Sequence, residues 1–124
     1  MNTLSSKDVT NSDIDYVLQT CHKEFEVMGN SNMLITGGAG FLGYYFVNSI
    51  LKWNEENPDK KIYALVLDNF IRGVPDWLKK LSIRTDLKIL DQSILEPLPK
   101  DFPKPNYIIH AASIASPIFY RKHP

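Results

Sequence analysis

Three glycines near the start of the chain have the spacing that could bind a dinucleotide pyrophosphate. Gly37, Gly40 and Gly43 follow the short apolar run 33–35. The first glycine would allow a tight turn, the second would let the backbone approach phosphate oxygens, and the third would let a new helix pack closely on the strand. Free N–H groups at the helix N-terminus, helped by the helix dipole, would hold the anion. A strand-to-helix turn without a ligand remains the alternative for the glycines alone.

Acidic residues follow the next two expected strands. The apolar run 62–67 ends at Asp68, and the next expected strand, 87–90, ends at Asp91. An acidic residue at the end of the second strand can accept hydrogen bonds from adenosine ribose hydroxyls and would repel a 2′-phosphate, which favours NAD over NADP. Asp91 could accept a hydrogen bond from the adenine amino group. Either aspartate could instead only cap the turn that follows its strand.

The exit of the fourth expected strand, 107–110, is built from small residues. Small side chains over 111–116 would let a flat ligand lie close to the backbone. His110 and Ser113 could suggest a base and a nucleophile, but no third group is evident beside them. We therefore expect His110 to hydrogen-bond to neighbouring backbone.

The elements that must position these residues alternate between strand and helix. Continuous apolar runs predict parallel strands that are covered on both faces. We expect a helix from Phe41 to about Trp53 with Leu42, Phe46, Val47, Ile50 and Leu51 toward the sheet, a short helix at 75–81, and an irregular proline-rich connection at 94–105. The pattern predicts the α/β class, with a parallel sheet of about four strands, flanking helices and an incomplete fold.

An additional helix is expected before the first strand. Ser12 and Asp15 have the spacing of a capping box, and Gly29 and Asn30 would end the helix. Residues 1 to about 11 are polar and are expected to be disordered or loosely attached. We therefore divide the chain into residues 1–30, an N-terminal extension with one helix, and residues 31–124, a partial nucleotide-binding domain.

Composition excludes several classes of function. Lys plus Arg equals Asp plus Glu at 14 each, which gives no electrostatic footprint for nucleic acid or an anionic membrane. Cys21 is the single cysteine, so an internal disulfide and a cysteine-cluster metal site are excluded. No apolar run approaches the roughly 20 residues that span a bilayer. A cytoplasmic protein without a membrane or nucleic-acid partner is expected.

From about Asn32 to the last residue, the chain resembles the NAD-dependent epimerase/dehydratase family, which are extended short-chain dehydrogenases/reductases. The segments 36–43, 67–70 and 110–113 carry this resemblance. The segment 115–120 looks most like the UDP-glucuronate decarboxylase branch. The resemblance implies a Rossmann-like fold, NAD as cofactor and a UDP-linked sugar as substrate.

The resemblance also implies a role for each candidate residue. Gly40, Phe41 and Leu42 would face the pyrophosphate, Asp68 and Asn69 the ribose, and Asp91 with Gln92 the adenine. Ile71, Arg72 and Gly73 would close over the ribose, Ala111 and Ser113 would lie beside NAD, and Ala115 and Tyr120 would lie at the sugar-nucleotide pocket.

Family members oxidise the sugar at C4 with a Tyr-x-x-x-Lys pair, and this pair is absent here. None of the six tyrosines has lysine four positions later. We therefore expect the N-terminal, NAD-binding portion of a nucleotide-sugar enzyme, inactive as this chain. The fourth strand would be an open edge, so a homo-oligomer is expected. The alternatives are an epimerase or dehydratase fragment, a non-catalytic adenine-dinucleotide-binding module, and a structural remnant that binds nothing.

Overall fold

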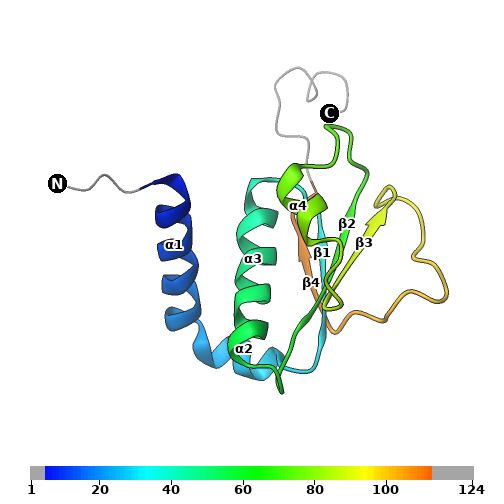
Figure 1. The fold of residues 1–124 in the computed structure, drawn as a ribbon. Helices are drawn as coiled ribbons and strands as arrows, with labels where there is room; N and C mark the ends of the chain where they lie inside the picture. Colours follow the sequence, from blue (N-terminus) through cyan, green and yellow to red (C-terminus); the bar gives the residue numbers. More distant parts are fainter. Residues whose placement is uncertain (1–4, 113–124) are drawn as a thin grey trace.

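A computed structural model describes residues 5–112 of the chain. Four parallel strands form one sheet in the order β3-β2-β1-β4. Four helices pack against one face of this sheet (Figure 1). The elements are α1 (Ser6–Thr20), α2 (His22–Met28), β1 (Asn32–Thr36), α3 (Phe41–Glu56), β2 (Tyr63–Asp68), α4 (Asp76–Leu81), β3 (Leu87–Asp91) and β4 (Tyr107–His110). The prediction of an incomplete Rossmann-like α/β fold with an N-terminal helix is confirmed.

The two central strands are buried on both faces, as their apolar runs predict. One face of β1 and β2 contacts the helices through Met33, Ile35, Ala64 and Val66. The helices contribute a larger set of side chains to this core: Ile14, Leu18, Phe25, Val47, Ile50, Leu51, Trp53 and Leu78.

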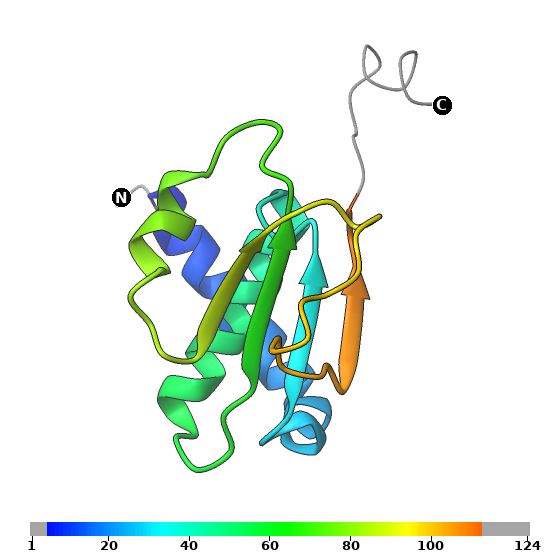
Figure 2. The ribbon, with the colours of Figure 1, turned by 90° about the vertical axis from the view of Figure 1, so that its right-hand side faces the viewer.

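The opposite face of the sheet is partly covered by an irregular segment of the chain. Leu34, Leu65 and Leu67 form a second, smaller core with Phe102. Phe102 belongs to the proline-rich connection between β3 and β4, which crosses in front of the sheet in Figure 2. The connection predicted to be irregular therefore covers part of the sheet.

The N-terminal extension differs from the prediction. Helix α1 begins at Ser6, and its capping box is formed by Ser5 and Asp8 rather than by Ser12 and Asp15. Residues 6–11 are helical and not disordered. Both Ser-x-x-Asp sequences satisfy the same pattern, but the earlier box adds almost two turns of helix, with Ser12 in its interior.

The extension also contains two helices where one was predicted. The chain bends at Cys21, which ends α1 and begins α2. The bend lets Ile14 and Leu18 join the core from α1 while Phe25 of α2 stacks on Trp53, with ring centroids 5.5 Å apart. Of the expected exit residues, Asn30 has the left-handed backbone (φ 62°), and Gly29 does not (φ −53°).

Helix α3 is rotated relative to the prediction. Val47, Ile50 and Leu51 are buried as expected, but Leu42 is 58% exposed and Phe46 is also exposed. Gly43 is the residue of the first turn that packs inward, and the 100° step between residues then directs Leu42 and Phe46 outward. The helix also runs to Glu56, beyond the predicted end at Trp53, and the Asn57 side chain donates a hydrogen bond to the Trp53 carbonyl oxygen.

Candidate functional site

The glycine turn joins β1 to α3 at the carboxyl end of the sheet. Gly37 has a left-handed backbone (φ 71°), as the tight turn requires. A Cβ atom on Gly43 would lie 2.2 Å from the Gly38 carbonyl oxygen, so only glycine lets α3 pack this closely on the turn. Among residues 5–112, a Cβ atom at Gly40 would meet nothing closer than the Gly37 carbonyl oxygen at 3.4 Å. Space beside Gly40 is therefore open for a ligand.

No side chain in the described part of the protein caps the N–H groups at the start of helix α3. Gly40 is the N-cap residue, and no side-chain hydrogen bond closes this end. Phe41 and Leu42, in the first turn, are both exposed. An uncapped N-terminus of this kind presents N–H donors and the positive end of the helix dipole to an anion.

Asp68 connects the second strand to the glycine turn. The Ala39 backbone N–H donates to Oδ2 of Asp68 at 3.1 Å, and the Phe70 N–H donates to Oδ1 at 2.8 Å. Asp68 therefore does cap its turn, as the alternative interpretation held, and it also lies against the glycine turn. Each carboxylate oxygen has a second acceptor position that could serve ribose hydroxyls.

The loop after β2 has the backbone of a compact turn. The Ile71 N–H donates to the Asn69 side-chain oxygen at 3.2 Å, and the Gly73 N–H donates to the Phe70 carbonyl at 2.8 Å. Gly73 has φ 84°, and Phe70 has φ 52°, which is uncommon for an aromatic residue. Ile71, Arg72 and Gly73 are exposed beside this end of the sheet.

Asp91 lies opposite Asp68 in the parallel register, so the two carboxylates stand at the ends of neighbouring strands. Asp91 is exposed. Gln92 donates its backbone N–H to the Asp68 carbonyl, and its side-chain amide donates to the carbonyls of Glu96 and Pro97. The Gln92 amide thus orders the loop, and its aliphatic stem and backbone remain the parts that could contact adenine.

The exit of β4 lies against Gly37. A Cβ atom there would be 2.6 Å from the Ala111 carbonyl oxygen, and the Ala111 N–H donates to the Thr36 carbonyl at 2.9 Å. His110 is bonded to the Thr36 side chain, with 2.6 Å between Oγ1 and Nδ1, rather than to backbone as predicted. The candidates Ser113, Ala115 and Tyr120 lie outside the described residues.

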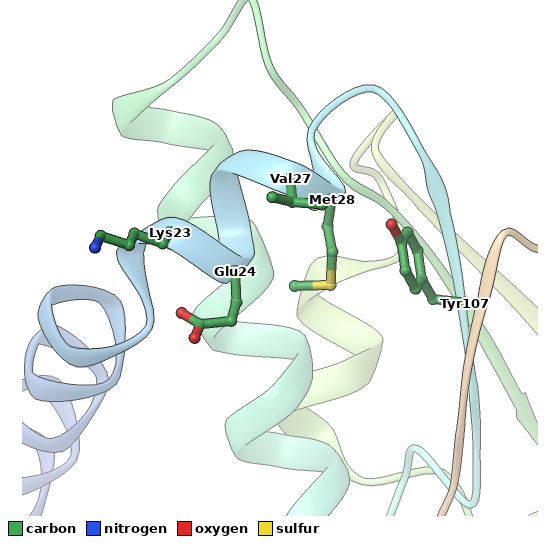
Figure 3. A pocket seen from close by; sticks show the side chains of 5 residues that line it. All are labelled: Lys23, Glu24, Val27, Met28 and Tyr107. Carbon is green, nitrogen blue, oxygen red and sulfur yellow. The ribbon is translucent and has the colours of Figure 1, made fainter.

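An apolar hollow lies at the other end of the sheet. Figure 3 shows Met28 of α2 beside Tyr107 at the start of β4, and Lys23, Glu24 and Val27 of α2 also line the hollow. Tyr107 pairs with Met33 at the amino end of β1, so this hollow is separated from the glycine turn by the length of the strands.

Three contacts of the site did not emerge from the sequence. Gly38 is needed because a Cβ atom would lie 2.6 Å from Cγ1 of Val66, and the bonds from Ala39 to Asp68 and from Thr36 to His110 join separate strands. The consecutive glycines at 37 and 38 were a local signal for the first contact. The other two depend on strand order, which the sequence pattern alone does not supply.

Comparison with known proteins shows the family of this chain. Residues 33–124 match the model of the NAD dependent epimerase/dehydratase family. The chain belongs to this family. Among the family's residues here are the whole glycine turn, Asp68, Asp91 and the exit of β4, whereas α1 and α2 lie before the matched region.

The curated relatives of this epimerase/dehydratase family chain are plant enzymes. The chain is 37% identical over 95 residues to UDP-glucuronic acid decarboxylase 6 of Arabidopsis thaliana. The aligned region covers 77% of the chain and 25% of the relative. The chain is 36% identical to UDP-glucuronic acid decarboxylase 5 of the same plant over the same shares. The chain thus spans about a quarter of the length of these relatives. Within residues 5–112, no helix has the length and apolar composition needed to cross a bilayer.

Proposed function

We propose that this chain is the N-terminal, NAD-binding portion of a nucleotide-sugar enzyme similar to UDP-glucuronate decarboxylase. The observation that carries the proposal is the glycine turn leading into the uncapped N-terminus of α3, with the Asp68 carboxylate bonded to the same turn. An exposed set of N–H donors beside a ribose-type acceptor is the arrangement that a dinucleotide requires.

The candidate residues take the following proposed roles. The pyrophosphate is bound by the turn and the first residues of α3, the ribose by the end of β2, and the adenine by the end of β3. The sets are Gly37, Gly40, Phe41, Leu42 and Gly43 for the pyrophosphate; Asp68, Asn69, Ile71, Arg72 and Gly73 for the ribose and its loop; Asp91 and Gln92 for the adenine; Ala111 and Ser113 beside NAD; and Ala115 and Tyr120 for the sugar nucleotide.

The proposed reaction of the parent enzyme begins with oxidation of a UDP-linked sugar. Bound NAD would accept the hydride from C4 of the sugar, and decarboxylation would follow. The names of the plant relatives support decarboxylation over epimerisation or dehydration. We propose that the 124 residues hold the cofactor without turnover, because their sequence contains no Tyr-x-x-x-Lys pair. A cytoplasmic location and the absence of nucleic-acid and membrane partners are part of the same proposal.

Calorimetric titration tests the cofactor assignment. We expect saturable binding of NAD, and weaker binding of NADP because Asp68 would face its 2′-phosphate. Asp68→Ala should weaken NAD binding by about tenfold or more, since hydrogen bonds to a charged acceptor contribute about 1.5–3 kcal/mol. Asp101→Ala, at an exposed aspartate in the β3–β4 connection, is the matched control. No saturable NAD signal in the wild type would overturn the proposal, and unchanged affinity in Asp68→Ala would remove that residue from the site.

The absent Tyr-x-x-x-Lys pair also favours a second candidate, a non-catalytic module that binds an adenine dinucleotide. The two candidates make the same prediction for NAD binding. They differ in whether the coding sequence continues to a Tyr-x-x-x-Lys pair. A longer coding sequence with a Tyr-x-x-x-Lys pair downstream supports the enzyme. Turnover of UDP-glucuronate by the 124 residues alone would contradict both.

A further inference from the structure

A side-chain hydrogen bond joins the carboxyl ends of β1 and β4, immediately before the glycine turn. Thr36 is the last residue of β1 and His110 is the last residue of β4, and the two are register partners. Oγ1 of Thr36 and Nδ1 of His110 are 2.6 Å apart. Thr36 is buried, with 6% of its surface exposed, whereas His110 is exposed. The bond is therefore shielded from water on the threonine side.

The residues that follow this pair touch each other. Gly37 lies so close to the exit of β4 that an added Cβ atom would be 2.7 Å from the Ala112 Cα. The Gly37 N–H donates to the Leu67 carbonyl of β2 at 2.8 Å, and the Ala111 N–H donates to the Thr36 carbonyl. The turn is thus held between the ends of β2 and β4, so any displacement of the β4 end must move the turn.

Different side-chain hydrogen bonds hold the two sides of the glycine turn. On the β2 side, the Asp68 carboxylate accepts from Ala39, within the turn itself. On the β4 side, the Thr36–His110 bond is the side-chain bond that the structure gives between the strand ends. Backbone pairing alone would leave the β4 end free to fray, because β4 is four residues long and has β1 as its neighbour in the described part of the sheet.

We propose that Thr36 and His110 are a positioning pair that holds the glycine turn in the conformation that binds the dinucleotide. Neither side chain needs to touch the cofactor: the pair fixes the end of β4 against Gly37, and Gly37 sets the direction of the N–H groups that follow. The inference rests on the proposed NAD site for its binding consequence, while the effect on the turn itself is independent of NAD.

The test uses four single variants, one double variant that combines Thr36→Val with His110→Ala, and two measurements. Thr36→Val and His110→Ala each remove the bond, and His110→Asn can restore it, because an asparagine side chain places a polar atom near the position of Nδ1. Tyr63→Phe, which removes a hydroxyl at the amino end of the sheet, is the matched control. The measurements are NAD affinity by calorimetry, and amide hydrogen exchange of Gly37, Gly40 and the core residue Val66 without nucleotide.

We expect Thr36→Val and His110→Ala to weaken NAD binding by about fivefold each, the typical net effect of one hydrogen bond. The double variant should lose no more than either single variant, because both remove one bond. Exchange at Gly37 and Gly40 should accelerate while exchange at Val66 stays unchanged, and His110→Asn should recover most of both effects.

Two results would overturn the proposed positioning role of Thr36 and His110. One is wild-type NAD affinity and wild-type exchange in both single variants, and the other is equal acceleration at Gly37, Gly40 and Val66, which would indicate a role in global stability only. If the wild-type protein binds no NAD, the proposed function fails, and the local exchange of Gly37 and Gly40 still decides the positioning role.

Discussion

At the scale of single residues, the glycines of the turn have separable tasks. Gly37 supplies a left-handed backbone, Gly43 supplies close contact with Gly38, and Gly40 leaves open space at the start of α3. The spacing of the glycines predicted these separate tasks. The structure confirms the tight turn at Gly37 and the close packing at Gly43. The phosphate approach at Gly40 stays a prediction.

Alanine at Gly43 and at Gly40 should therefore have different effects. Gly43→Ala would place a methyl group 2.2 Å from a carbonyl oxygen, so we expect a loss of about 1–3 kcal/mol in the free energy of unfolding. The methyl group of Gly40→Ala meets no atom of the described residues nearer than 3.4 Å, and the change should cost at most about 1 kcal/mol at this N-cap position. The NAD affinity of Gly40→Ala should nevertheless fall steeply, because the methyl group would occupy the space proposed for the phosphate.

Urea denaturation and calorimetric titration of both variants measure these effects. A Gly40→Ala protein that binds NAD like the wild type would show that phosphate does not approach this glycine. A Gly43→Ala protein of wild-type stability would contradict the close packing of α3 on the turn.

A partly buried ion pair just before β3 gives a residue-scale prediction about pH. Arg84 donates to both carboxylate oxygens of Asp86 at 2.9 Å, and Asn54 donates to the same carboxylate at 3.0 Å. Asp86 is only 4% exposed. The Arg84 hydrogen bonds, opposed by burial and assisted by Asn54, hold the pKa of Asp86 below its ordinary value.

The pKa of Asp86 is lower in the folded state than in the unfolded state, so the ionised carboxylate adds to the free energy of unfolding at neutral pH. This stabilisation is lost as the pH falls through about 4 and below, where the carboxylate takes up a proton. We expect Asp86→Asn to lower stability at pH 7 by about 2 kcal/mol, since it weakens charge-assisted bonds. The stability difference from the wild type should shrink as the pH falls. Urea denaturation between pH 7 and pH 3 measures both effects, and a difference that stays constant across this range would contradict the assignment.

At the scale of elements, the strands were predictable and the helices were less so. The continuous apolar run that ends at Asp68 predicted the end of β2 closely, because burial on both faces needs an unbroken apolar sequence. The end of β3 at Asp91 was also predicted, although β3 contains the exposed Lys88 and is only partly buried. The start of α1 could not be decided by pattern, since Ser5 and Ser12 both precede an aspartate by three residues. The orientation of α3 depended on Gly43, whose contact with Gly38 is formed only in the tertiary structure.

Removing each candidate cap tests the start of α1. Ser5→Ala should lower stability by about 1 kcal/mol, because its side chain accepts from the Asp8 N–H at 3.1 Å. Ser12→Ala should be neutral or slightly stabilising, since Ser12 lies in the helix interior, where alanine is the better helix former. The comparison uses chemical denaturation followed by circular dichroism, and the reverse order of effects would place the helix start at Ser12.

At the scale of the whole molecule, β4 is one of the two edge strands of the sheet that the structure describes. In the described residues, β4 pairs with β1 along one edge, and Ile108 is 62% exposed on the face away from the helices. A strand of this composition at an edge favours association with another polypeptide. Residue-level reasoning anticipated this property, and we propose a homo-oligomer on the same ground.

Sedimentation velocity tests the association. We expect species heavier than the 14.2 kDa chain at micromolar concentration. In Ile108→Lys, the equilibrium between monomer and oligomer should shift toward the monomer. Ile83→Lys, at an exposed isoleucine in the turn before β3, is the matched control. A wild-type protein that stays monomeric at all concentrations would contradict the proposed oligomer.

The central claim is that NAD binds at the glycine turn, and mapping of backbone amide shifts by NMR during NAD titration tests it most directly. We predict saturable shifts at Gly40, Phe41, Leu42 and Asp68, with little change at Met28 and Tyr107, which lie at the opposite end of the sheet. Shifts confined to the hollow between α2 and Tyr107, or no shifts at saturating NAD, would contradict the claim.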